Sequence, residues 1–139
     1  MQTITEKLLT ELKNAKDIQK FLDKHEDEFI SETHVSFLNY MLSEKNITIA
    51  KLSKESGVGE YLYKIFNNTR NPSRESMIAV GLALELSMEE IQLLLRISKF
   101  ALLDSRDKRD SIIIFGFINH LSVFEVDDLL NQNNFITIN

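Results

Sequence analysis

The chain has 139 residues, of which 43% are hydrophobic and 27% are charged, with one proline, four glycines, no cysteine and no tryptophan. This composition is typical of a globular protein with few loops, and the lack of cysteine excludes disulfides, cysteine-ligated metal sites and thiol nucleophiles. No segment approaches the roughly 18 apolar residues that a membrane span needs, and the first residues lack the pattern of a secretory signal. We therefore expect a soluble, cytoplasmic protein that makes no membrane contact.

The net charge of −5 is distributed unevenly along the sequence. Residues 48–74 carry a net charge of +3, whereas residues 1–46 and 75–97 each carry −3 and residues 98–139 carry −2. The acidic total argues against nonspecific coating of nucleic acid, but a local basic surface can still bind an anion. The sequence therefore predicts that an anion-binding surface, if there is one, lies within residues 48–74.

The low glycine and proline content, with abundant Leu, Ile, Glu and Lys, predicts helices joined by short turns. Apolar residues recur at helical spacing over residues 4–12 and 18–22, which fits two short helices or one bent helix. They recur again over residues 35–42, in a helix that ends near Asn46. The acidic tract 25–28 is interpreted as a solvated surface, because adjacent residues of a helix point in different directions and do not close a metal site.

Two short helices separated by a glycine turn come next. Thr48 is a candidate N-cap for a helix over Ile49–Ser56, which the Gly57-Val58-Gly59 turn ends. Apolar residues within Glu60–Asn67 predict the second helix, and a polar stretch up to Pro72 closes it. Such a pair describes a helix-turn-helix unit, in which the first helix braces the second and the second enters the major groove of DNA. The basic segment covers the same residues, so two independent features agree.

Side chains that can cap a helix recur after this loop, each before apolar residues at helical spacing. Two of them have the capping-box spacing, a serine followed three residues later by a glutamate. The candidates are Ser73, Ser87 with Glu90, and Ser122 with Glu125. The apolar run Ile112–Ile118 contains three consecutive isoleucines, which favour a strand, but a single strand in an all-helical chain has no partner. We interpret the run as a buried helix that is core beneath the C-terminal tail or, in part, a dimer surface.

Three adjoining segments carry a family resemblance: residues 52–58 (LSKESGV), 61–76 (YLYKIFNNTRNPSRES) and 77–95 (MIAVGLALELSMEEIQLLL). They resemble the Xre or lambda-repressor-like helix-turn-helix domains of bacteria and phages. Residues 15–29 and 105–130 resemble the flanking helical segments of a full-length type of that family. The resemblance implies an all-α fold, a lambda-repressor-like helix-turn-helix bundle with extra N- and C-terminal helices. It implies a single helical domain over residues 1–139, with an N-terminal extension at 1–30, the helix-turn-helix domain at 31–98 and a C-terminal helical tail at 99–139.

The resemblance further implies a sequence-specific DNA-binding transcriptional regulator that binds double-stranded DNA, commonly as a homodimer. The family's base-edge positions correspond to Gly59, Glu60, Tyr61 and Lys64, with Tyr63 and Asn67 beside them. Its phosphate-contacting positions correspond to Thr48, Lys51, Lys54, Asn68, Thr69, Arg70 and Asn71. The residues implied to lock the helix pair to the core are Leu52, Val58, Leu62 and Ile65.

Some of these residues have a purely structural alternative. One of Tyr61 and Tyr63 is expected to pack against the protein, because residues two apart on a helix do not share a face. Arg70 either contacts phosphate or closes the C-terminus of the second helix. Asn68 stands where the family usually has glycine, and asparagine tolerates the left-handed conformation, so we expect the turn to be kept.

The tip of the second helix departs from the family pattern. Between Val58 and Tyr61 the chain has only Gly59-Glu60, where family members carry three residues, often Ser-Arg-Ser, so a cation is lost and an anion gained. This departure and the acidic net charge support an alternative function, a protein-interaction module of the same fold that has lost DNA binding. We predict no catalytic residue, metal site or cofactor, because His34 and His120 are isolated and no phosphate-binding glycine loop is present.

Overall fold

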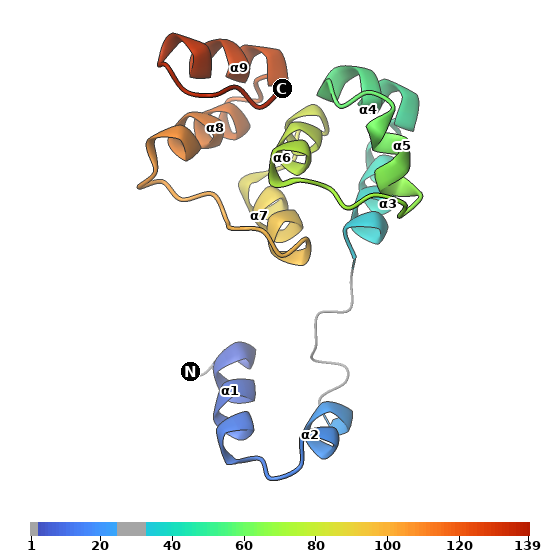
Figure 1. The fold of residues 1–139 in the computed structure, drawn as a ribbon, viewed down its shortest axis with the longest axis vertical. Helices are drawn as coiled ribbons and strands as arrows, with labels where there is room; N and C mark the ends of the chain where they lie inside the picture. The colour runs from blue at the N-terminus through green and yellow to red at the C-terminus, as the bar shows by residue number, and fades with distance from the viewer. Residues whose placement is uncertain (1–2, 25–32) are drawn as a thin grey trace. The chain divides into compact units, whose positions relative to one another are not determined.

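The computed structural model describes residues 3–24 and 33–139, and the regular structure of these residues is helical, with no strand (Figure 1). This confirms the predicted all-helical class. The helices are α1 (Ile4–Asn14), α2 (Ile18–Lys24), α3 (His34–Lys45), α4 (Ile49–Ser56), α5 (Tyr61–Phe66), α6 (Arg74–Ala83), α7 (Met88–Ile97), α8 (Lys108–Ile118) and α9 (Val123–Gln132). Contacts divide the chain into two compact units, Met1–Ser31 and Glu32–Asn139. Among the described helices, none has the length and apolar character needed to cross a membrane.

The first unit contains α1 and α2 as separate helices, so the sequence pattern here corresponds to two short helices and not to one bent helix. α1 begins with a capping box, in which the Thr3 hydroxyl accepts from the Glu6 amide at 3.1 Å. Phe21 is the one buried residue among those described in this unit. The acidic tract 25–28 and the expected boundary between residues 30 and 31 lie outside the described residues.

Side-chain caps define where the helices of the second unit begin. In six of them a Ser, Thr or Asp side chain accepts from the backbone amide three residues on, which satisfies a donor that the helix leaves unpaired. These caps are Thr33, Thr48, Ser73, Ser87, Asp107 and Ser122, which include all of the predicted ones. Residues with left-handed backbone end α3 at Asn46 (φ 54°) and α4 at Gly57 (φ 74°).

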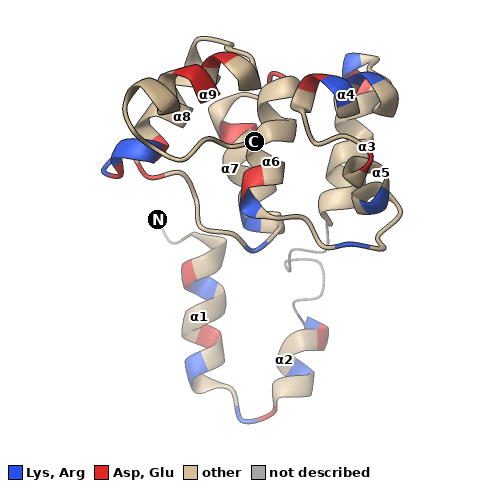
Figure 2. Cartoon of the chain, turned by 45° about the horizontal axis from the view of Figure 1, so that its top comes forward, with Lys and Arg blue, Asp and Glu red and all other residues tan. Residues whose placement is uncertain are grey.

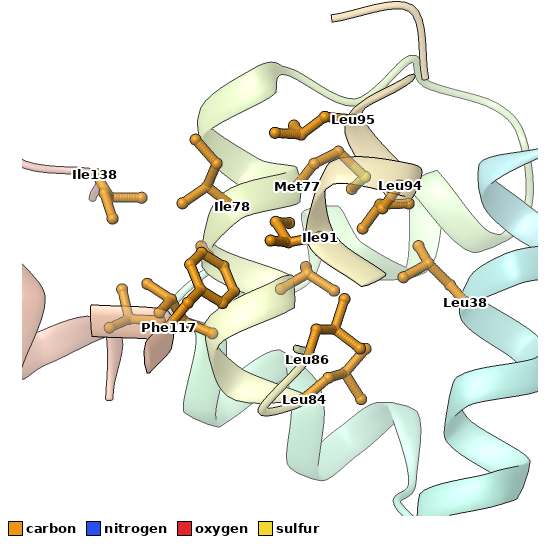
Figure 3. Close-up of a cluster of buried hydrophobic side chains, with 14 of the residues drawn as sticks. Leu38, Met77, Ile78, Leu84, Leu86, Ile91, Leu94, Leu95, Phe117 and Ile138 are labelled. Atoms are coloured by element: carbon orange, nitrogen blue, oxygen red, sulfur yellow. The ribbon is translucent and has the colours of Figure 1, made fainter. Parts of the chain in front are cut away.

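The core of the second unit surrounds α6. All residues of Met77–Leu82 are buried, and all but Gly81 belong to one cluster with side chains from α3, α4, α5, α7, α8 and α9. Figure 3 shows part of this cluster, including Leu38 of α3, Ile91 of α7 and Phe117 of α8. Helices α6 and α7 lie between α3, α4 and α5 on one side and the α8–α9 hairpin on the other (Figure 1). The α4–α5 pair is therefore placed by packing on the central helices.

The apolar run Ile112–Ile118 lies within α8, so its prediction as a helix is confirmed. Ile113 and Phe117 are buried, whereas Phe115 and Ile118 are 51% and 61% exposed. One face of α8 is therefore core and the other is an apolar surface. The core interpretation holds for part of the run, and a dimer contact stays a prediction for the remainder.

Two ion pairs join the first turns of α6 and α8. Arg74 contacts Asp110 at 3.2 Å and also donates to two backbone carbonyls that precede α8. Arg109 donates to both carboxylate oxygens of Glu75, at 2.8 and 2.9 Å, and these hydrogen bonds raise the pKa of Arg109. Because Asp110 is only 7% exposed, its charge needs partners, and besides Arg74 the Asp104 amide donates to the carboxylate at 3.1 Å.

The chain after α9 is irregular, so the predicted helical tail 99–139 consists of two helices and a non-helical end. We call residues Phe135–Asn139 the C-terminal segment. Asp127 of α9 accepts from the last two amides of this segment, at 2.6 and 3.2 Å. Arg109 donates to the Ile136 carbonyl at 2.9 Å, and the Ile138 side chain is buried in the core. This segment is not helical, because side chains from α8 and α9 form hydrogen bonds with its backbone in place of helical ones.

Replacing Gly57 with alanine is expected to destabilise the protein more than replacing Gly59. Both glycines have left-handed φ angles, 74° and 70°, which cost any other residue about 1–2 kcal/mol. A Cβ on Gly57 would also lie 2.5 Å from the side-chain nitrogen of Asn139, whereas nothing lies within 4 Å of a Cβ on Gly59. The Asn139 side chain would have to move and give up its bond to the Ser56 carbonyl, so urea unfolding should give a loss for Gly57→Ala that exceeds the loss for Gly59→Ala by roughly 1 kcal/mol. Equal losses would contradict the close approach of Asn139.

Candidate nucleic-acid interface

Hydrogen bonds fix the turn between α4 and α5. The Gly59 amide donates to the Ser53 carbonyl at 3.2 Å, and the Val58 amide donates to the Ser56 hydroxyl at 3.3 Å. Ser56 is fully buried, so water does not compete for its hydroxyl. The side-chain amide of Asn139 donates to the Ser56 carbonyl at 2.9 Å. Together these bonds set the direction in which α5 leaves the turn.

Apolar side chains anchor the helix pair to the core, as predicted. Leu52 of α4 and Leu62 and Ile65 of α5 are each 0% exposed. Val58 in the turn is half-buried against the same cluster. A helix as short as α5 is not stable alone in water, so this packing is what keeps it helical.

Tyr61, Tyr63 and Lys64 of α5 face outward, whereas Phe66 is half-buried against the core. The helix is one residue shorter at each end than the predicted Glu60–Asn67, because Glu60 is its N-cap and Asn67 is its C-cap. The Glu60 side chain makes no capping hydrogen bond. The exposed residues are Glu60, Tyr61, Tyr63, Lys64 and Asn67, whereas Gly59 is half-buried. The structure therefore brings most of the predicted base-edge residues to one accessible helix.

The loop after α5 is held against the helix. The Tyr61 hydroxyl donates to the Asn71 carbonyl at 2.6 Å, and the Thr69 hydroxyl donates to the Lys64 carbonyl at 3.2 Å. Asn68 has a φ of 58°, which confirms the expected left-handed turn. Tyr61 thus braces the loop through its hydroxyl although 37% of it is exposed, so its structural role is a hydrogen bond and not the packing expected for one of the two tyrosines.

Arg70 does not close the end of α5 with its side chain. Its guanidinium makes no hydrogen bond or ion pair with any described residue, while its backbone amide donates to the Lys64 carbonyl at 3.3 Å. The Thr69 amide donates to the same carbonyl at 3.0 Å. Backbone amides and the Thr69 hydroxyl therefore satisfy the carbonyl at the end of α5, the role that was one of the two alternatives for the Arg70 side chain. The charge of Arg70 faces solvent.

Exposed cations lie along α4, α5 and the following loop (Figure 2). Lys54, Lys64 and Arg70 form no ion pair within the part of the chain that the structure describes. Lys51 lies 3.8 Å from Glu55 in an exposed pair one helical turn apart. Such surface pairs contribute little to stability, so Lys51 can exchange this partner for a phosphate. We call the exposed residues of α4, α5 and the loop 67–71 the basic surface.

The basic surface is less positive than the sequence suggested. Arg74 contributes to the +3 of residues 48–74, but its side chain faces Asp110 and lies apart from the other cations of that segment. Glu55 and Glu60 remain as carboxylates among the four outward cations. A local positive excess is kept within a chain that is acidic elsewhere.

Thr48 can serve the basic surface while it caps α4. Its hydroxyl oxygen accepts from the Lys51 amide at 3.1 Å, which leaves the hydroxyl proton free to donate to a phosphate oxygen. Asn67, Asn68 and Asn71 add exposed amide groups at the other end of the surface. Neutral donors therefore flank the cations.

His34 and His120 lie in other parts of the second unit, and His25 lies outside the described residues. His34 begins α3, where burial lowers its pKa, and His120 lies in the turn between α8 and α9. Within residues 3–24 and 33–139, no three His, Cys, Asp or Glu side chains are grouped so as to hold a metal ion.

Comparison with known proteins adds no further constraint. No family model matches the sequence, and no curated protein or solved structure matches it. A function for the basic surface therefore has to be argued from its residues and from the motif resemblance.

Two residues that shape the turn have no recognisable sequence signal. Ser56 reads as an ordinary polar residue at a helix end, although its hydroxyl and carbonyl both bond within the turn region. Asn139 is 83 residues away from Ser56 along the chain, so no local sequence pattern links the two residues. Only the packing of α9 against α6, which brings the C-terminal segment to α4, shows that they meet.

Replacing Tyr61 with phenylalanine should loosen the loop after α5, because it removes the 2.6 Å bond to the Asn71 carbonyl. We expect a loss of about 0.5–1.5 kcal/mol in urea unfolding, the usual net value of one hydrogen bond. Tyr63→Phe is the matched control, since the Tyr63 hydroxyl has no hydrogen-bond partner among the described residues. If the two variants unfold alike, Tyr61 does not brace the loop.

Proposed function

We propose that the chain is a sequence-specific DNA-binding transcriptional regulator of the Xre type, with a lambda-repressor-like helix-turn-helix arrangement in which α4 braces α5. The observation that carries the proposal is the exposed face of α5 beside three cations, Lys54, Lys64 and Arg70, that have no partner among the described residues. The net charge of the chain is −5, so this local positive excess is not a property of the whole surface. A basic patch beside an exposed short helix suits a polyanion with a groove.

In this proposal α5 enters the major groove and contacts the base edges. Lys64 can donate to O6 or N7 of guanine, and Glu60 can accept from N4 of cytosine. Six helical residues are roughly 9 Å long, which matches the rise of about three base pairs. Each half-site is therefore expected to be short, with Glu60 selecting against bases that lack a donor.

Phosphate contacts would supply most of the affinity. Thr48, Lys51 and Lys54 lie on α4 or at its start, and Arg70 lies in the loop on the other side of α5. Contacts on both sides of a recognition helix fix its register along the duplex and carry little sequence information. Each neutralised phosphate contributes about 0.9 to the slope of log affinity against log salt, so binding should weaken steeply as salt rises.

A homodimer is part of the proposal because one short helix reads too few base pairs for a unique site. Two-fold partners of this kind place their recognition helices in successive major grooves, roughly 34 Å apart. Phe115 and Ile118, the exposed apolar residues of α8, supply an uncovered surface that a second copy could bury. The expected operator is an inverted repeat.

The alternative function is a protein-interaction module of the same fold. It is favoured by Glu60, an exposed carboxylate at the tip of α5 whose side chain makes no capping bond. Glu55 adds a second negative charge nearby on α4. In this case a protein partner would bind the surface, and the purified chain would have no affinity for duplex DNA.

Selection of binding sites from a random duplex pool with the purified chain tests the proposal. We expect recovery of an inverted repeat. Lys64→Ala should weaken binding by about 1–3 kcal/mol and relax preference at one base position. Arg70→Ala should weaken binding evenly across sequences and reduce the salt slope by about 0.9.

Lys108→Ala is the control, because this exposed lysine lies on α8 and outside the basic surface. It should bind the recovered duplex like wild type. No recovered site, together with a stoichiometric protein partner, would favour the alternative function. Wild-type binding by both Lys64→Ala and Arg70→Ala would show that DNA is bound by another surface.

A further inference from the structure

We propose that the C-terminal segment is a positioning element for the DNA-reading helix. Its Asn139 side chain closes the end of α4 and so fixes the turn from which α5 departs, without contacting DNA itself. The role rests on the proposed function, since it concerns how well α5 is presented to a duplex.

The C-terminal segment is held in place by side chains from two other helices. Asp127 accepts from the amides of Ile138 and Asn139, and Arg109 donates to the Ile136 carbonyl. The Ile138 side chain is only 8% exposed, which adds an apolar anchor. Because the segment has no helical hydrogen bonds of its own, these contacts determine where Asn139 lies.

Asn139 acts at a point where the helix pair would otherwise be loose. The last carbonyls of a helix lack intrahelical donors, and the Asn139 side-chain amide supplies one to Ser56 at 2.9 Å. The same nitrogen lies 2.5 Å from where a Cβ of Gly57 would stand, so it packs directly on the turn. Gly57 and Gly59 make this turn intrinsically flexible, and the Asn139 contact restricts it.

The contacts form a continuous path from the C-terminal hairpin to α5. Asp127 holds the backbone of Asn139, Asn139 bonds to the Ser56 carbonyl, and the Ser56 hydroxyl accepts from Val58. Two residues after Val58 the exposed tip of α5 begins at Glu60. Release of the C-terminal segment would therefore widen the range of orientations of α5, and DNA binding would have to restrict them again.

Charge and positioning make opposite predictions for Asp127, which allows a sharp test. Removing a carboxylate from an acidic protein should strengthen binding to a polyanion if charge alone matters. Asp127→Asn, however, keeps the shape of the side chain while one of the two amide contacts is lost. If the C-terminal segment positions α5, the variant should bind more weakly despite its gain in charge.

The experiment compares Asp127→Asn with Asp128→Asn, its neighbour on α9. Asp128 is exposed and makes no hydrogen bond or ion pair with any described residue, and the two variants lose the same charge. Affinity for the duplex recovered by random-site selection is measured by fluorescence anisotropy, at a temperature where circular dichroism shows every variant folded. We expect Asp127→Asn to bind about three- to tenfold more weakly than wild type and Asp128→Asn to bind equally or more tightly.

A second pair separates positioning from stability. Asn139→Ala should weaken binding to a similar extent, whereas Asn131→Ala, an exposed asparagine of α9, should not. In Asn139→Ala, hydrogen exchange should quicken at the amides of Val58 and Gly59 while the amides of α6 keep their protection. A residue that only stabilised the fold would not change the affinity of fully folded protein.

The outcomes keep the two proposals distinct. If wild type recovers no duplex, the proposed DNA binding fails, and the positioning role fails with it. If wild type binds and Asp127→Asn and Asn139→Ala bind as tightly as their controls, the positioning role alone is overturned. Faster exchange at the turn without weaker binding also overturns it.

Discussion

Helix α6 imposes the constraint on which the second unit depends, because its successive residues Met77–Leu82 are all buried. α4, α7 and α9 pack directly on it, and there is little room where side chains of α7 and α8 meet Gly81. A Cβ on Gly81 would lie 2.6 Å from the Ile91 side chain and 3.2 Å from that of Phe117. Because α4 packs on α6, the short α5 needs only its own two buried side chains and the turn after α4 to remain ordered while its other face is exposed.

The distribution of charge follows from which side chains this packing engages. Docking of α8 on α6 uses Arg74 and Arg109, each matched by a carboxylate. These cations are therefore committed to structure, whereas Lys64 and Arg70 have no partner among the described residues. The positive excess of the basic surface therefore comes from the local sequence of residues 48–74, and the pairing of Arg74 with Asp110 reduces it.

Much of the helical framework was predictable because its signals are local in sequence. Thr48 caps the start of α4 and Gly57 caps its end, as expected. Asn68 takes the left-handed conformation, which asparagine tolerates. Contacts between distant residues were not predictable: Arg74 meets Asp110 across 36 positions and Asn139 meets the Ser56 carbonyl across 83. The first contact pairs one cation of the basic segment 48–74 with a carboxylate, and the second adds a distant residue to the turn between α4 and α5. The residues predicted to bind DNA come from a motif resemblance, which suggests roles that periodicity and charge do not.

Amide hydrogen exchange of the full chain, measured with and without the duplex recovered by random-site selection, tests the central claim most directly. If α5 lies in the groove, added protection should centre on Tyr61–Phe66 and the loop 67–71, and extend to the start of α4 near Thr48. The α8–α9 hairpin should gain protection only where a second copy covers Phe115 and Ile118. Protection confined to the hairpin or to residues 3–24, with exchange in α5 unchanged, would contradict the account.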